Sequence, residues 1–121
     1  MIKILNGFPD NVVAASAIGR VTRQDCSSVL IPHIEITANR HSRIRWYYEI
    51  GKDFAGMEAG AVWEDFRIGR EYWMQLERVA VLTDVTWITH VVNALRVLMP
   101  FQMRVYQLSE RNRVRVWLLW Q

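Results

Sequence analysis

Short runs with strand character alternate along this chain with longer segments of helical spacing. The clearest strand is residues 42–50, where Ile44, Trp46, Tyr48 and Ile50 alternate with Arg43, Arg45, Tyr47 and Glu49. Such alternation is typical of a strand with one buried face and one solvated face. The other expected strands are 2–5, 12–18, 78–83 and 102–108, and the expected helices are 23–39, 58–74, 86–99 and a terminal helix after Ser109. Strands that alternate with helices indicate crossover connections and a largely parallel sheet. We therefore predict an α/β fold of order β-β-α-β-α-β-α-β-α.

Several expected helix ends carry local signals. Thr22 followed three residues later by Asp25 predicts a capped start for the helix over 23–39. Asp84 predicts the cap of the helix over 86–99, which Pro100 ends, and Ser109 predicts the cap of the terminal helix.

Two segments permit a second interpretation. Pro32 lies inside the expected helix over 23–39, so that segment reads either as a helix bent near Pro32 or as a strand over 29–37. The alternating run 113–117 permits a strand where we expect the terminal helix.

Composition bounds the class of protein. With 121 residues, half of them hydrophobic, the chain is expected to form one domain, residues 1–121, with a real core. The net charge is +3, but 15 basic and 12 acidic residues are interleaved, so we expect no nucleic-acid partner. The single cysteine, Cys26, is expected in the core of a cytoplasmic protein. No signal-peptide pattern or apolar run of membrane-spanning length is visible.

No residue pattern points to catalysis. Four carboxylates cluster between residues 53 and 65, and we interpret them as caps and solvated surface: Asp53, Glu58, Glu64 and Asp65. The histidines His33, His41 and His90 lack paired metal-ligand spacing. No nucleophile elbow or phosphate loop occurs. We therefore expect no enzyme activity, no metal and no cofactor.

Aromatic residues carry the more informative signal. Trp63, Trp73 and Trp87 fall at or beyond the expected strand ends, where open α/β sheets bind ligands. They are either large packing residues or the lining of a pocket. As candidate ligand-binding residues we take five that would line a small apolar cleft: Asp53, Phe54, Trp63, Asp84 and Trp87.

Two features predict an interface. Sequential crossovers of one hand place the connecting helices on one face of a sheet, which leaves Arg43, Arg45 and Tyr47 on a face without a helical layer. The terminal helix is apolar over most of its circumference and carries Trp117 and Trp120. A homodimer would cover these surfaces most simply, and a protein partner could also do so.

A membrane-surface helix is the rival interpretation of the chain end. Three arginines, Arg111, Arg113 and Arg115, stand near two tryptophans there, as in interfacial anchors. We rank this below dimerisation, because one short helix with three arginines binds lipid only weakly.

Three stretches resemble a known family. Residues 7–13 (GFPDNVV), 51–65 (GKDFAG and GAVWED) and 78–88 (RVAVLTDVTWI) are similar to the SpoIIAA-like proteins, small bacterial relatives of STAS and CRAL-TRIO domains. The resemblance extends over nearly the whole chain. It implies a right-handed β-α superhelix with a mostly parallel sheet of four to five strands and about four helices. It also favours a helix over 22–39, as the first crossover, against a strand.

The same resemblance shapes the functional expectation. STAS regulators of the anti-sigma-antagonist type are phosphorylated on a serine at the helix after the third strand, but residues 52–72 contain no serine or threonine. We therefore expect a non-catalytic regulatory or scaffolding module that binds a protein partner without that switch. The alternative is a carrier or sensor of an apolar or amphipathic small molecule, held at the carboxyl ends of the strands. Because the chain lacks the extra helices of CRAL-TRIO domains, a long-chain lipid is not expected to fit.

Overall fold

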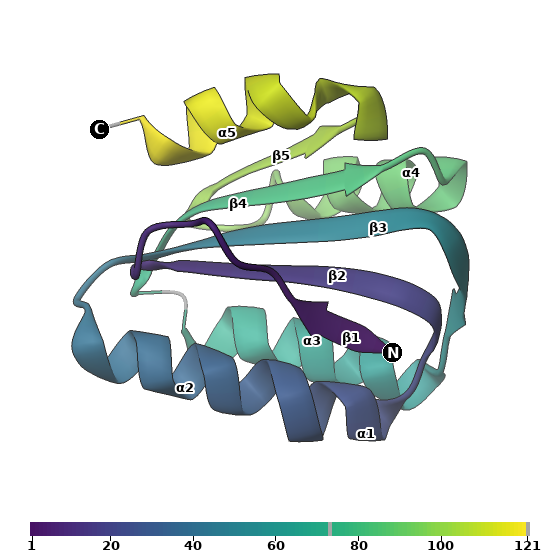
Figure 1. Ribbon diagram of the computed structural model, residues 1–121, viewed down its shortest axis with the longest axis horizontal. Coiled ribbons are helices and arrows are strands. Elements are labelled where there is room, and N and C mark those ends of the chain that lie inside the picture. The colour runs from purple at the N-terminus through teal and green to yellow at the C-terminus, as the bar shows by residue number, and fades with distance from the viewer. Residues whose placement is uncertain (73, 121) are drawn as a thin grey trace.

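The computed structural model of the chain describes residues 1–72 and 74–120, without the side chains of Asp65 and Gly69. Its centre is a five-stranded sheet in which the strands are neighbours in the order of the sequence (Figure 1). The strands are β1 (Ile2–Ile4), β2 (Val12–Val21), β3 (Ile44–Met57), β4 (Leu76–Thr83) and β5 (Gln102–Tyr106). β1 runs antiparallel to β2 and every other pair is parallel. The predicted α/β fold is therefore confirmed. Trp73 lies outside the described residues.

Four helical segments accompany the sheet within the described residues. The first combines α1 (Arg23–Asp25), a π-helical turn (Cys26–Leu30) and α2 (Ile31–Arg40). The others are α3 (Ala59–Glu71), α4 (Thr86–Leu95) and α5 (Arg111–Leu119), the last preceded by a 3-10 turn (Leu108–Glu110). The strand interpretations of 29–37 and 113–117 are therefore wrong.

The first helix begins as its sequence predicts. Thr22 and Asp25 form the capping box, since the Asp25 N–H donates to Thr22 Oγ1 at 3.1 Å and the Thr22 N–H donates to Asp25 Oδ2 at 2.9 Å. Pro32 sits in the first turn of α2 and has no N–H to donate. The preceding turn is π-helical, with the Ile31 N–H bonded to the Cys26 carbonyl, and this wider turn gives the proline ring room. Cys26 is buried, as expected.

β3 continues seven residues past the predicted end. The stretch from Gly51 to Met57 was expected to be a loop, but it remains paired with β2, where Gly19 lies opposite Phe54 and Val21 opposite Met57. Asp53 is therefore a strand residue, and the prediction that it caps α3 is wrong. The N-cap position belongs to Glu58, whose side chain accepts the backbone N–H of Arg23 at 3.0 Å.

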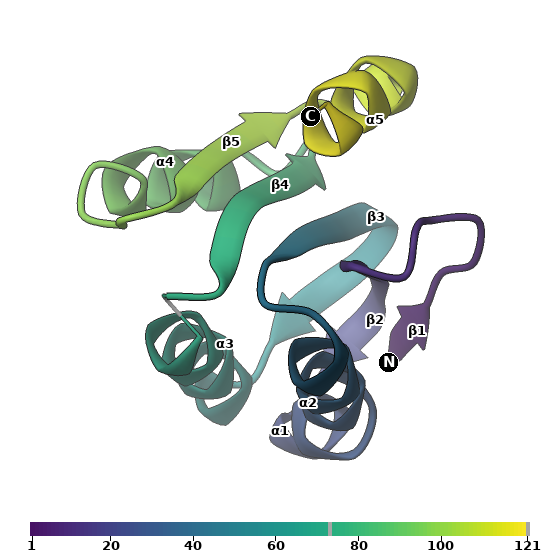
Figure 2. The same ribbon diagram turned by 90° about the vertical axis from the view of Figure 1, so that its left-hand side faces the viewer.

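Two apolar cores lie on opposite faces of the sheet. One face carries alternate residues of β3 and β4, including Trp46, Tyr48 and Val79, and packs against α2, α3 and α4. The other face carries Tyr47, Ala80 and Leu82 and packs against α5. The predicted alternation of residues 42–50 and the placement of all crossover helices on one face are thus confirmed (Figure 2).

α5 covers the face that we expected to be bare. Val114 and Leu118 of α5 are fully buried there, and Tyr47 is only 3% exposed. Arg45 and Arg78 bind the C-terminal end of α5. Arg45 Nη1 donates to the carbonyls of Leu118 and Trp120. Arg78 Nη1 donates to the carbonyls of Trp117 and Trp120. The expectation of a sheet face without a helical layer is therefore wrong, because the chain's own last helix folds back onto it.

Two predicted caps also differ. Asp84 does not cap α4, whose N-cap position is Val85; its Oδ1 accepts the backbone N–H of Leu108 at 3.1 Å instead. Ser109 lies inside the 3-10 turn, where Gln107 and Glu110 form the capping box.

Candidate binding groove

An apolar groove opens between α3 and α4 on the larger core face. Figure 2 shows these two helices set apart on either side of β4, and a groove of about 220 Å³ lies there. Its floor is made by inward-facing residues of the three last strands: Trp46, Tyr48, Ile50, Val79, Val81 and Met103. We call this feature the α3–α4 groove.

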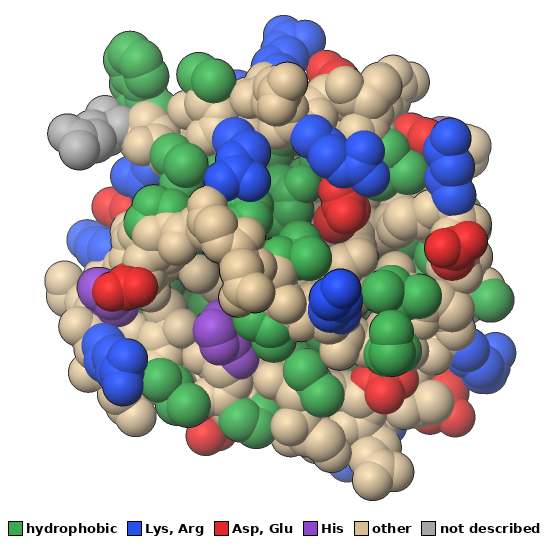
Figure 3. All heavy atoms as spheres, viewed as in Figure 1, with side chains coloured by type: hydrophobic (Ala, Val, Ile, Leu, Met, Phe, Trp, Pro, Cys, Tyr) green, Lys and Arg blue, Asp and Glu red, His purple; other side chains and the backbone are tan. Residues whose placement is uncertain are grey.

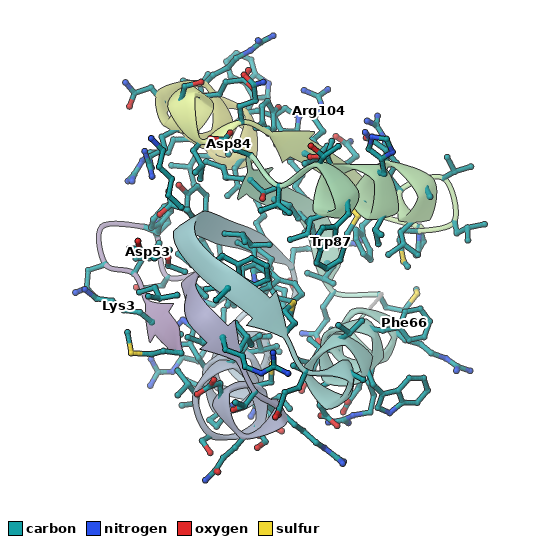
Figure 4. All side chains as sticks on the ribbon, turned by 90° about the vertical axis from the view of Figure 1, so that its right-hand side faces the viewer. Lys3, Asp53, Phe66, Asp84, Trp87 and Arg104 are labelled. Atoms are coloured by element: carbon teal, nitrogen blue, oxygen red, sulfur yellow. The ribbon has the colours of Figure 1, made fainter. Side chains whose placement is uncertain are left out.

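The walls come from the facing sides of the two helices. α3 contributes Val62 and Phe66, and α4 contributes Trp87, Ile88, Val91, Val92 and Leu95. Figure 4 shows Trp87 and Phe66 on the two sides of the space between these helices. Ile88 and Val92 are buried, whereas Val62, Phe66, Trp87 and Val91 remain substantially exposed. The rim therefore presents large apolar groups to solvent that the chain itself does not cover.

Trp46 at the floor has an unusual polar atom. Its side chain is 7% exposed and stacks on Tyr48, with ring centroids 5.4 Å apart. The indole Nε1 is buried and has no hydrogen-bond partner within the part of the chain that the structure describes. Buried indole N–H groups usually have an acceptor, so this buried donor is an exception to that rule.

Of the five predicted ligand-binding residues, the structure places only Trp87 in the α3–α4 groove. Phe54 is partly buried and packs against the core. Trp63 lies on α3, is 59% exposed and stacks on Phe66 with centroids 6.0 Å apart. The interpretation of Trp63 and Trp87 as packed core residues is therefore wrong, because both are more than half exposed.

Asp53 and Asp84 lie elsewhere and together line a polar hollow of about 570 Å³, beside the middle of β2 and β3 and the carboxyl end of β4. Figure 4 shows both carboxylates away from Trp87. The same hollow is lined by Lys52, Ser109 and Arg111. The structure thus places Trp87 in the groove, Asp53 and Asp84 in the hollow, and Phe54 and Trp63 in neither. The apolar groove lies over the sheet face, whereas we expected the apolar cleft at the strand ends.

Two charged groups that line this hollow, Glu49 and Arg111, pair with each other. Glu49 accepts from the Tyr47 hydroxyl at 3.2 Å and forms an ion pair with Arg111. Burial, together with the nearby charge of Glu49, raises the pKa of Tyr47 to about 12. Among the described residues, no group of three or more His, Cys, Asp or Glu side chains is arranged to hold a metal ion.

Glu64 was expected on the solvated surface, and this is wrong. It is 5% exposed and pairs with Arg67 Nη2 at 2.8 Å and Arg23 Nη2 at 3.5 Å. The hydrogen bond from Arg67 holds the pKa of this carboxyl below its usual value. Glu64 therefore links α1 to α3 and is a structural residue.

The predictions missed most of the groove. Trp46 and Tyr48 were assigned to the core face without a role, and Val91 was not singled out. α4 carried the available signal, because Trp87, Ile88, Val91, Val92 and Leu95 form an apolar face wider than the strip that one packed helix usually buries.

The comparisons with known proteins identify the family. The SpoIIAA-like family model matches residues 12–119, so the chain belongs to the SpoIIAA-like family. A crystal structure of an uncharacterized protein of the DUF3478 family with a SpoIIAA-like fold, from Shewanella loihica PV-4, is similar with a TM-score of 0.73 at 18% identity, over 98% of this chain and 92% of that one. That likeness supports the fold alone. No curated protein matches the chain. No helix in its described part has the length and hydropathy needed to cross a bilayer.

Proposed function

We propose that the protein is a non-catalytic binding module that holds a small apolar molecule in the α3–α4 groove. The observation that carries this proposal is the lining, in which every residue is apolar or aromatic and the rim stays exposed. Placing an apolar ligand there removes apolar surface of both partners from water, which is the main driving force for such binding.

The size of the groove limits the ligand. At about 220 Å³, it exceeds the roughly 150 Å³ engineered cavity that holds benzene and falls short of the roughly 300–1,000 Å³ of pockets for drug-sized molecules. The proposed ligand is therefore small, or enters the groove with one end. This agrees with the expectation that a long-chain lipid does not fit.

The experiment compares two valines on helices of opposite faces. Val91 on α4 is 47% exposed and lines the groove, and Val116 on α5 is 66% exposed and lies away from it. We expect the neutral fluorescent probe N-phenyl-1-naphthylamine to bind the wild type and Val116→Glu alike. In Val91→Glu the dissociation constant should rise at least about tenfold, because the probe would bury a carboxylate. Equal binding, or no binding, by all three proteins would contradict the proposal.

The second candidate is the regulatory or scaffolding module that binds a protein partner. The stacked pair Trp63 and Phe66 favours it, since Trp63 is exposed outside the groove and exposed aromatic anchors are typical of protein interfaces. Loss of a partner in Trp63→Ala, with probe binding absent from the wild type, would favour this function over the first.

A further inference from the structure

The outward side of α5 carries apolar residues that the chain leaves uncovered. Val114 and Leu118 are buried against the sheet. Val116 lies two residues from each of them, which on a helix turns it away from the sheet. It is 66% exposed, and Trp120, four residues later, is 65% exposed. α5 is the outermost layer on its side of the sheet (Figures 1 and 2), so both side chains face solvent.

Arginines surround these two apolar residues. Residues 111–120 contain three arginines and neither Asp nor Glu. Because successive residues on a helix are about 100° apart, Arg113 and Arg115 lie on either side of Val116. Arg104 on the adjoining strand β5 is exposed, and its guanidinium carbon lies 4.6 Å from the centroid of the Trp117 ring. We call this surface the α5 outer face; its members are Arg104, Arg111, Arg113, Arg115, Val116 and Trp120.

The cations of the α5 outer face are more exposed than the carboxylates that pair with them. The side chain of Arg113 is 78% exposed, against 28% for its partner Glu110. The side chain of Arg111 is 54% exposed, against 15% for its partner Glu49. The α5 outer face therefore presents positive charge to an approaching surface.

From these observations we infer that the α5 outer face binds the surface of a bilayer that contains anionic lipids. In this contact the arginines lie against lipid phosphates, while Val116 and Trp120 enter the headgroup region. The inference goes beyond the proposed function and does not depend on it, because α5 and the α3–α4 groove lie on opposite faces of the sheet.

A bilayer fits the α5 outer face better than a second copy of the chain does. The other side of α5 packs on the chain's own sheet, so a symmetric dimer could use only the outward side. A two-fold axis near Val116 would bring the arginines of both copies close together, and like charges repel. A polyanion such as DNA would use the arginines and leave Val116 and Trp120 without an apolar partner.

The test measures co-sedimentation with vesicles of phosphatidylcholine alone and of phosphatidylcholine mixed with an equal amount of phosphatidylglycerol. Two variants alter the α5 outer face: Arg113→Gln removes a charge, and Val116→Glu places a carboxylate between the arginines. Each has a matched control elsewhere on the surface. Arg70→Gln removes an exposed arginine of α3, and Val97→Glu changes a valine that is 81% exposed after the end of α4.

We expect the wild type and both controls to bind the mixed vesicles, and to bind pure phosphatidylcholine much more weakly. Arg113→Gln should weaken binding to the mixed vesicles roughly fivefold, the factor that one basic residue near an anionic bilayer contributes. Val116→Glu should weaken it at least about tenfold, because its carboxylate is repelled by the lipid charge and loses hydration on entering the headgroup region. If Val116→Glu folds poorly, Arg113→Gln against Arg70→Gln decides the test.

Equal binding of the mixed vesicles by all five proteins, or no binding by the wild type, overturns the inference and leaves the proposed function standing. Two further measurements test the other occupants of the α5 outer face. A wild-type dimer in sedimentation velocity that Val116→Glu dissociates would assign the face to a second copy. Binding of the wild type to duplex DNA that exceeds its vesicle binding at the same salt would assign the face to a polyanion. Either result overturns the inference.

Discussion

Gly56 occupies a backbone position in β3 that other residues rarely adopt. Its φ is 132°, and a side chain there is strained even though the nearest atom to an added Cβ is 3.8 Å away. We expect Gly56→Ala to lower the free energy of unfolding by about 1–3 kcal/mol, measured by urea denaturation. Gly51→Ala is the control, because nothing lies within 4 Å of its added Cβ and its φ is ordinary. Equal effects of the two substitutions would refute the strain argument.

Tyr47 should make stability depend on pH in the alkaline range. Burial raises its pKa to about 12, above the value of about 10 in an unfolded chain. A raised pKa favours the neutral hydroxyl in the folded state, so this contribution is complete below about pH 10 and is lost as the pH rises toward about 12.

The variant Tyr47→Phe isolates this effect, since the other titrating groups are shared. We expect the free energy of unfolding of the wild type, minus that of Tyr47→Phe, to fall between about pH 10 and pH 12 in urea denaturation. A difference that stays constant over this range would show that the pKa of Tyr47 is the same in both states.

For single residues, a contact could be predicted from the sequence when its two partners lie close together along the chain. The capping box of Thr22 and Asp25 could be predicted, because both members are three residues apart and use only local geometry. The role of Asp84 could not, because the N–H that it accepts belongs to Leu108, 24 residues later. The burial of Glu64 depends similarly on Arg23 from another helix.

Among the helices and strands, α5 is the one whose attachment to the sheet the structure explains most directly. Arg78 donates to the carbonyl of Trp120 at 2.9 Å and stands over the ring of Trp117, 5.5 Å from its centroid. Figure 3 shows Lys and Arg side chains gathered over this helix. A guanidinium at the C-terminal end of a helix also interacts favourably with its dipole.

We therefore expect Arg78→Met to lower the free energy of unfolding by about 1.5–3 kcal/mol, the range for hydrogen bonds to charged groups. Arg113→Met is the matched control, because Arg113 is exposed and its ion pair is with Glu110 of the same segment; its effect should stay within about 0.5 kcal/mol. Similar losses in both variants would contradict the role given to Arg78.

β3 and α5 show why the sequence alone predicted only part of the fold. The strand prediction ended at Ile50 because Gly51, Lys52 and Asp53 have low strand propensity, yet pairing with β2 extends the strand to Met57. For α5, the spacing of Val114 and Leu118 indicates a helix with an apolar side. It does not say which surface that side meets, and the structure supplies the sheet face around Tyr47 and Leu82.

At the scale of the molecule, α5 decides which face remains open. It covers the face that carries Arg45 and Tyr47, so the reason for expecting a partner there is removed. Interface roles for Arg43, Arg45, Tyr47, Trp117 and Trp120, the homodimer and the single domain all stay predictions. An apolar groove with an exposed rim lies instead between α3 and α4, on the face that carries all the crossover helices.

Binding in the α3–α4 groove is the central claim, and NMR mapping with a neutral apolar probe tests it most directly. Backbone and indole signals of ¹⁵N-labelled protein are followed while N-phenyl-1-naphthylamine is added to saturation. We predict that the shifting signals cluster at Trp46, Val62, Phe66, Trp87 and Val91, while Val116 on α5 stays unchanged. Shifts centred on α5, or no saturable shifts at any concentration the probe reaches, would contradict the claim.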